Sequence, residues 1–162
     1  MMAVASPPPG IYLLPILSGH LGANGRFDPF TFRESLAPVS RILLAEDDTT
    51  MRTFLARALE RAGHEVFAVG DGMEALAAAR TVQFDMLVAD VVMPSLDGFQ
   101  LAARARAAYP DLRVMFITGF AAVSLRGRDT EFSGAKVLSK PFHLRELVDR
   151  VHEILHAQTS AL

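Results

Sequence analysis

From residue 41 onward, short apolar runs alternate with longer amphipathic stretches. The apolar runs are four to six residues long, which is typical of strands buried in a parallel sheet. They lie at 41–45, 65–69, 85–90, 113–118 and 136–139. Elsewhere apolar residues recur every three or four positions, which predicts helices. These helices are expected at about 51–62, 71–81, 97–109 and 144–155.

Polar and breaking residues mark the expected helix ends. Thr49 or Thr50 is the expected cap of the first helix, and Gly63 is expected to end it. Asp71, followed three residues later by Glu74, has the spacing of a capping box. In the same way Asp97 is expected to cap the third helix, which Pro110 closes.

Five strands alternating with about five helices predict an α/β fold, in which a parallel sheet carries helices on both faces. The weakest helix is expected in the small-residue segment 119–125, and 126–134 is expected to be a loop. The length of 162 residues fits one domain, which the pattern places at 41–157. A flexible tail is expected at 158–162.

The first forty residues differ from the rest, because proline and glycine interrupt every candidate element in 1–40. The first basic side chain, Arg26, lies beyond the apolar part, so the segment lacks the basic start of a secretory signal. We expect a disordered extension, or upstream sequence that is not translated in the cell.

Composition excludes several classes of protein. The net charge of -2 gives no indication of general nucleic-acid binding. No apolar stretch reaches the roughly 18 residues of a membrane-spanning helix. The chain has no cysteine, which excludes disulfides and thiolate metal sites and fits a cytoplasmic protein.

Polar groups stand where four of the expected strands end. They are the acidic triplet 46–48, Asp90, Thr118 and Lys140. All C-terminal ends of a parallel sheet lie on one edge, where the ligands of such sheets bind, so these groups can converge. Two carboxylates about 4 Å apart repel by roughly 4 kcal/mol at an effective dielectric of about 20, so an acidic cluster must take up a proton or hold a cation. Oxygen ligands favour Mg²⁺.

Each of these residues alone has an ordinary structural interpretation. An acidic triplet is most often a solvated turn, and Asp90 alone is as well explained as a cap. Lys140-Pro141 alone marks only a turn. Their joint occurrence, in order and each at a strand end, is what favours a phosphoryl-accepting site centred on Asp90.

Over residues 41–157 the chain resembles the receiver domain of bacterial two-component response regulators. The resemblance rests on Ile-Leu-Leu-Ala-Glu-Asp-Asp followed by Met-Arg, Asp-x-x-Met-Pro-x-x-Asp-Gly, Thr-Gly and Lys-Pro-Phe. It implies a flavodoxin-like (CheY-like), doubly wound fold with strand order 2-1-3-4-5. It also implies a cis peptide bond between Lys140 and Pro141.

The resemblance further implies a role for each matching residue. Asp90 would be the phosphoacceptor, and Thr118 and Lys140 would hold the phosphoryl group. Mg²⁺ would be held by Asp47 directly, by Glu46 through water, by Asp90, and by the backbone carbonyl of Val92. A phosphoacceptor of this kind is not expected to be an enzyme beyond its own phosphotransfer and dephosphorylation.

Two positions depart from the family pattern. Val137 stands near the place where many receivers have an aromatic switch residue, so signalling is expected to run through Phe120 and the segment 119–125 instead. Val92 is apolar where many members have a polar side chain that orients water. A long-lived acyl phosphate is the consequence we expect.

Residues 115–123 and 136–148 look like the CpdR subfamily of single-domain regulators. That resemblance implies a phosphoryl donor, a histidine kinase or histidine phosphotransferase, and a downstream ClpXP-type protease that the unphosphorylated form primes. About twenty residues follow Lys140, too few for a helix-turn-helix after the last helix. Output is therefore expected through a protein partner, without direct DNA binding or a membrane.

Three other interpretations fit the sequence less well. A Mg²⁺-dependent aspartyl phosphohydrolase commonly has a second Asp two residues after its nucleophile, where this chain has Val92. A Rossmann-like nucleotide site needs a Gly-rich loop after the first strand, where this chain is acidic. A degenerate scaffold receiver would not need the intact acidic cluster.

His152 and His156 have metal-ligand spacing, but no third ligand is evident, so they are interpreted as solvated surface.

Overall fold

The computed structural model describes residues 39–119 and 135–157. These residues form five strands and four helices. In chain order they are β1 (Arg41–Ala45), α2 (Thr49–Arg61), β2 (Glu65–Val69), α3 (Gly72–Thr81), β3 (Met86–Asp90), α4 (Gly98–Ala108), β4 (Arg113–Thr118), β5 (Lys136–Ser139) and α5 (Leu144–His156).

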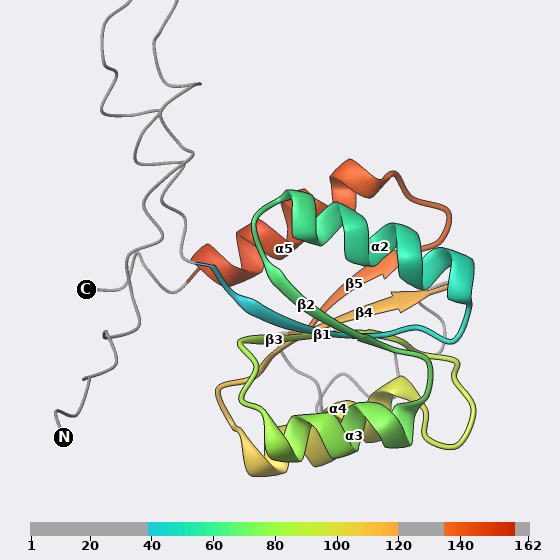
Figure 1. Cartoon of the computed structure of the whole chain (residues 1–162), viewed down its shortest axis with the longest axis vertical. Coiled ribbons are helices and arrows are strands. Elements are labelled where there is room, and N and C mark those ends of the chain that lie inside the picture. The colour runs from blue at the N-terminus through green and yellow to red at the C-terminus, as the bar shows by residue number, and fades with distance from the viewer. Residues whose placement is uncertain (1–38, 120–134, 158–162) are drawn as a thin grey trace, which may run out of the picture. The chain divides into compact units, whose positions relative to one another are not determined.

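The five strands form one parallel sheet in the order β2-β1-β3-β4-β5, which confirms the predicted flavodoxin-like topology. Helices α2 and α5 cover one face of the sheet, and α3 and α4 cover the other (Figure 1). The registers align the strands so that β1, β3, β4 and β5 all end at the same edge. That edge carries the predicted site.

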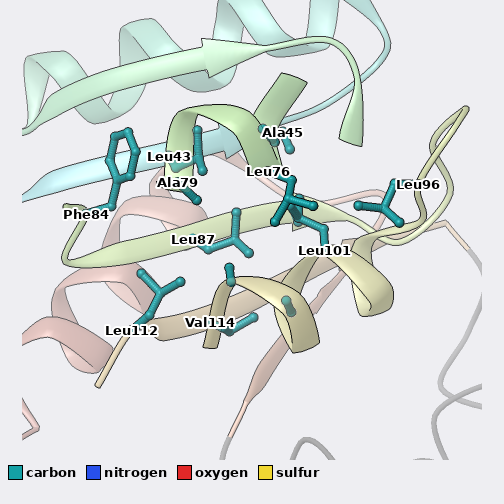
Figure 2. Close-up of a cluster of buried hydrophobic side chains, with 14 of the residues drawn as sticks. Leu43, Ala45, Leu76, Ala79, Phe84, Leu87, Leu96, Leu101, Leu112 and Val114 are labelled. Carbon is teal, nitrogen blue, oxygen red and sulfur yellow. The ribbon is translucent and has the colours of Figure 1, made fainter. Parts of the chain in front are cut away.

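The alternation of side chains along each strand divides the core in two. Leu43, Leu87 and Phe116 point toward α3 and α4, in the cluster that Figure 2 shows in part. Their neighbours Leu44 and Val88 point the other way, toward α2 and α5. Each fully buried side chain of this size contributes about 1.5–3 kcal/mol, so both helical layers are held mainly by apolar burial.

Burial of the strands is complete in the middle of the sheet and falls off at its outer strands. Strand β3 is buried at all its residues, whereas β2 is buried only at Val69. Phe67 on β2 is 49% exposed. An edge strand has a neighbouring strand on one side only, so its side chains stay partly open to solvent.

The helix ends agree with the sequence except at one cap. The carboxylates of Asp71 and Asp97 accept hydrogen bonds from backbone amides of the first turns of α3 and α4, as predicted. Helix α2 is capped by Asp48, whose carboxylate accepts from the Met51 amide at 2.7 Å, and not by Thr49 or Thr50. Asp48 occupies the cap position because Asp caps a helix at least as well as Thr does, and because Asp48 comes one residue earlier in the chain.

Gly63 follows the end of α2 in the left-handed conformation, with a φ of 94°. This backbone region favours glycine and confirms the predicted stop. The expectations for 1–40 (apart from 39 and 40), for 120–134 and for 158–162 lie outside the described residues. Among the described helices, none has the length and apolar character that crossing a membrane requires.

Candidate functional site

The polar residues predicted to converge lie at one edge of the sheet. Glu46 directly follows β1, while Asp90 and Thr118 are the last residues of β3 and β4. These three residues are buried, with 1%, 6% and 3% of their surface exposed, respectively. Buried polar side chains of this kind require partners, and the residue after β5 supplies one.

Lys140 joins two of the acids. Its Nζ donates to Glu46 Oε2 at 2.9 Å and to Asp90 Oδ2 at 2.8 Å. Its backbone amide donates to the Thr118 carbonyl at 2.8 Å, which holds the start of the loop against the end of β4. The Lys140-Pro141 peptide bond is cis, as the family resemblance implied.

Three carboxylates form the acidic part of the site. One oxygen from each of Glu46, Asp47 and Asp90 lies within 4.8 Å of the other two. Three carboxylates beside one ammonium leave two negative charges without a partner in this group. A divalent cation with oxygen ligands would balance them, so the donor set fits Mg²⁺.

Burial acts on both charged partners of the central ion pair. Burial raises the pKa of the Glu46 carboxyl, with a smaller contribution from the Asp90 charge, although the hydrogen bond from Lys140 opposes it. For Lys140, burial alone would lower the ammonium pKa, but the hydrogen bonds to Asp90 and Glu46 prevail and raise it. The lysine therefore remains a cation in this pocket at neutral pH.

The loop after β3 fixes the orientation of the Asp90 carboxylate. The Val92 amide donates to Asp90 Oδ1 at 3.0 Å, and the Gly98 amide donates to the Val91 carbonyl at 3.1 Å. The backbone of Gly98 lies so close to Asp90 that an added Cβ would stand 2.2 Å from the Asp90 carbonyl oxygen. Gly98 therefore lets α4 begin directly against the strand end that carries Asp90.

Arg52 is a site residue to which the sequence analysis gave no role. Its Nη1 donates to the backbone carbonyls of Glu46, at 2.6 Å, and Asp47, at 3.2 Å. Its Nη2 donates to the Thr49 hydroxyl at 3.2 Å. Arg52 thus holds the acidic turn in place from the first turn of α2. The sequence signal was its place in the Met-Arg pair that follows the acidic triplet in the family motif, five positions after Asp47.

The remaining predicted residues have different outcomes. The amide of Val92 binds Asp90, and its side chain is 54% exposed beside the carboxylate. Phe120 lies outside the described residues. The interpretation of both α5 histidines as solvated surface is wrong for His152, whose ring lies 5.2 Å from that of His64 and whose Nε2 is buried. His156 is exposed, as expected.

The response regulator receiver domain family matches residues 42–152 of this chain. A curated relative, the response regulator receiver protein CpdR of Brucella abortus, is 50% identical over 119 residues, covering 74% of this chain and 99% of the relative. The transcriptional regulatory protein TcrA of Mycobacterium tuberculosis is 39% identical over 70% of this chain, and the match spans only 45% of that longer protein.

Solved structures agree with these relatives. The receiver domain from hybrid histidine kinase CckA is 36% identical, with a TM-score of 0.61 over 71% of this chain and 98% of that domain. A CheY-like receiver domain protein from Methanospirillum hungatei is 27% identical, with a TM-score of 0.69 over 75% of this chain and 97% of that protein.

Proposed function

The chain belongs to the response regulator receiver domain family, and we propose that it is a phosphorylated switch whose acceptor is Asp90. The observation that carries this proposal is the hydrogen bond of Lys140 to a buried carboxylate at the C-terminal edge of the sheet. The position suits an acceptor because one face of the carboxylate adjoins a cation and the strand end faces the open edge.

In the proposed reaction, an Asp90 carboxylate oxygen attacks the phosphorus of a phosphohistidine. The new O–P bond forms as the N–P bond breaks, and the imidazole nitrogen leaves with the bonding electron pair and takes up a proton. Lys140 would neutralise a phosphoryl oxygen, and the Thr118 hydroxyl would donate a hydrogen bond to another. Arg52 would keep the acidic turn at the distance that the reaction needs.

Mg²⁺ would be held by Asp47, by Asp90, by Glu46 through water and by the Val92 carbonyl. When bound, the ion offsets the charge that the incoming phosphoryl group brings. The uncompensated charge of the three carboxylates supports this assignment. Since Glu46 is paired with Lys140, its oxygen Oε1 is the one more open to a water ligand, although it also accepts from the Asp48 amide.

The direct test is phosphorylation by a small donor. Incubated with acetyl phosphate and Mg²⁺, the wild-type protein should gain one phosphoryl mass, and Asp90→Ala should gain none while keeping its circular dichroism spectrum. Asp111→Ala, which changes an exposed acid near the start of β4, is the matched control and should be labelled like the wild type. Labelling of Asp90→Ala would overturn the assignment.

The donor we propose is a histidine kinase or histidine phosphotransferase, which would dock beside the site. A groove of about 520 Å³ adjoins Lys140 and is lined mainly by apolar side chains. Phe54 on α2 is 53% exposed there, and Leu144 at the start of α5 is 41% exposed. Apolar side chains exposed next to a reactive carboxylate fit the apolar face of a donor helix.

Docking of the donor protein and transfer of the phosphoryl group can be tested separately. Phe54→Ala should slow phosphotransfer from a purified phosphorylated donor protein and leave labelling by acetyl phosphate unchanged, because the small donor does not use the groove. Val82→Ala, at another partly exposed apolar position, is the control. Equal slowing with both donors would place Phe54 in the chemistry instead.

Output would be a change in protein binding, in the cytoplasm. The likeness to CpdR favours a ClpXP-type protease as the downstream partner, primed by the unphosphorylated form. Purified protease should bind Asp90→Ala and the untreated wild type alike, and acetyl phosphate should weaken binding of the wild type alone. If phosphorylation left binding unchanged, the protease assignment would fail while the acceptor assignment stood.

A further inference from the structure

Three histidines from two distant parts of the sequence lie together at the edge of the sheet opposite to Asp90. His64 directly precedes β2, at the N-terminal ends of the strands, and His152 and His156 lie in the last turns of α5. Asp90 closes β3 at the C-terminal ends. The cluster is therefore separate from the proposed phosphorylation site and independent of that proposal.

Three ring nitrogens of this cluster, two of His64 and one of His152, are buried without hydrogen-bond partners. His64 is only 8% exposed, and neither of its ring nitrogens has a hydrogen-bond partner. The buried Nε2 of His152 has none either. Proteins leave few buried polar atoms unsatisfied, and an ion is one of the recognised explanations where they do.

The spacing of the rings fits coordination of one cation. The ring centres of His64 and His152 are 5.2 Å apart, and those of His152 and His156 are 6.0 Å apart, both pairs at an interplanar angle of 61°. Two imidazoles bound to one tetrahedral zinc at about 2.0–2.1 Å place their ring centres roughly 5–6 Å apart. His152 and His156, four residues apart, share one face of the helix.

The protonation state also suits a metal ligand. Burial lowers the pKa of His64, and the neighbouring His152 and His156 lower it further. Neutral imidazole is the form that binds metals. The oxygens of the acidic cluster lie within 4.8 Å of one another, and the nitrogens of the three histidines do not all meet that spacing. At least one ring, most simply that of exposed His156, must therefore turn about its side-chain bonds on binding.

We propose that His64, His152 and His156 form a binding site for a transition-metal cation that prefers imidazole, with Zn²⁺ as the chemically best match, and that the bound ion ties the end of α5 to the turn before β2. The open fourth position would be taken by water.

The experiment uses the full chain without a histidine tag, in excess Mg²⁺ so that the oxygen site is filled by an ion that avoids imidazole. Co²⁺ is titrated first, because its visible absorption reports nitrogen coordination, and Zn²⁺ is then added to displace it. We expect one ion per chain. His152→Gln and His156→Gln should each weaken binding about tenfold or more, since even outer-shell changes cost about 10–100-fold.

Matched controls are His143→Gln, at the cap of α5, and His20→Gln, the remaining histidine of the chain. Both should bind like the wild type. Zn²⁺ should also raise the melting temperature of the wild type but not that of the His152→Gln, His156→Gln double variant. Unchanged affinity in that double variant, loss of binding in either control, or one ion per two chains would each overturn the proposal.

Discussion

Lys140 is the residue on which the charge balance of the acidic site depends. Replacing it by methionine leaves Glu46 and Asp90 buried with no ammonium between them. The Lys140 side chain is 24% exposed, so solvent screens part of the effect. In the presence of a chelator, we expect Lys140→Met to lower the free energy of unfolding by about 1–3 kcal/mol. This is less than the cost of removing one partner of a fully buried ion pair.

Mg²⁺ should restore much of that stability, because the divalent ion replaces the missing positive charge. Urea unfolding with chelator and with Mg²⁺ measures both effects. Lys136→Met, at the chain's other lysine, which is exposed on β5, is the control and should respond to neither. A Lys140→Met protein whose stability is indifferent to Mg²⁺ would contradict a metal site at these carboxylates.

Val92 is the residue that governs how long the phosphoryl group should last. Its side chain stands 54% exposed next to Asp90 and has no group that can hydrogen-bond an attacking water. We expect slow hydrolysis of the acyl phosphate and a several-fold faster loss in Val92→Asn. The measurement is the decay of label in purified protein after removal of the donor. Loss of label from the wild type within seconds would contradict the prediction.

Sequence reasoning found the site residues that stand at strand ends and missed those that act from elsewhere. Glu46, Asp90 and Lys140 meet at one edge as the parallel pattern predicts, although their roles remain predictions. Arg52 was given no role because it binds backbone carbonyls, which any sequence has. His64 was missed as a neighbour of His152 because 88 positions separate them and only the packing of α5 near α2 brings them together.

At the scale of elements, the start of α4 is the most constrained junction near the site. A Cβ on Gly98 would meet the Asp90 carbonyl at 2.2 Å and the Val91 Cα at 3.1 Å, both backbone atoms that cannot turn away. Gly98→Ala should therefore push α4 from the strand end, lower the melting temperature by several degrees and slow labelling by acetyl phosphate.

The matched control is Gly63→Ala, where nothing lies within 4 Å of the added Cβ but φ is 94°. It should lower stability through backbone strain and leave the labelling rate of the remaining folded protein unchanged. Equal labelling rates in both variants would show that the Asp90 carboxylate does not depend on the close approach of α4.

The elements themselves were predictable because local signals and the global fold agree. Bounds of β1, β2, β4 and β5 match the apolar runs, since each run has the length of a strand and polar or breaking residues follow it. The cap at Asp48 was not predicted because Asp48 belongs to the acidic triplet, and an acid in such a cluster has the same residue type as a cap. Exposure of β2 could not be read from Val66, Phe67 and Ala68, because an apolar run does not say which strands lie at the edges.

At the scale of the whole molecule, the two titratable clusters lie at opposite edges of one sheet and respond to pH in different ways. The acidic site holds opposite charges beside each other, so protonation of its acids removes an attraction. In the histidine cluster the ring of His64 lies against that of His152, which in turn lies near that of His156. Protonation there adds a repulsion to a desolvation cost.

The consequence is a loss of stability in mild acid that His64 controls. Its folded pKa is lowered, first by burial and then by His152 and His156, so the unfolded chain takes up this proton at a higher pH than the folded protein does. The stability that the neutral His64 ring contributes is fully present above the pKa of about 6.5 that the ring has in the unfolded chain. It is lost as the pH falls through the lower pKa that the ring has in the folded protein. Urea unfolding in the presence of a chelator should show that the free energy of unfolding falls as the pH is lowered from about 7.5 to 5.5. His64→Leu should reduce this loss and His143→Gln should not, whereas a loss of the same size in His64→Leu would assign it to other groups.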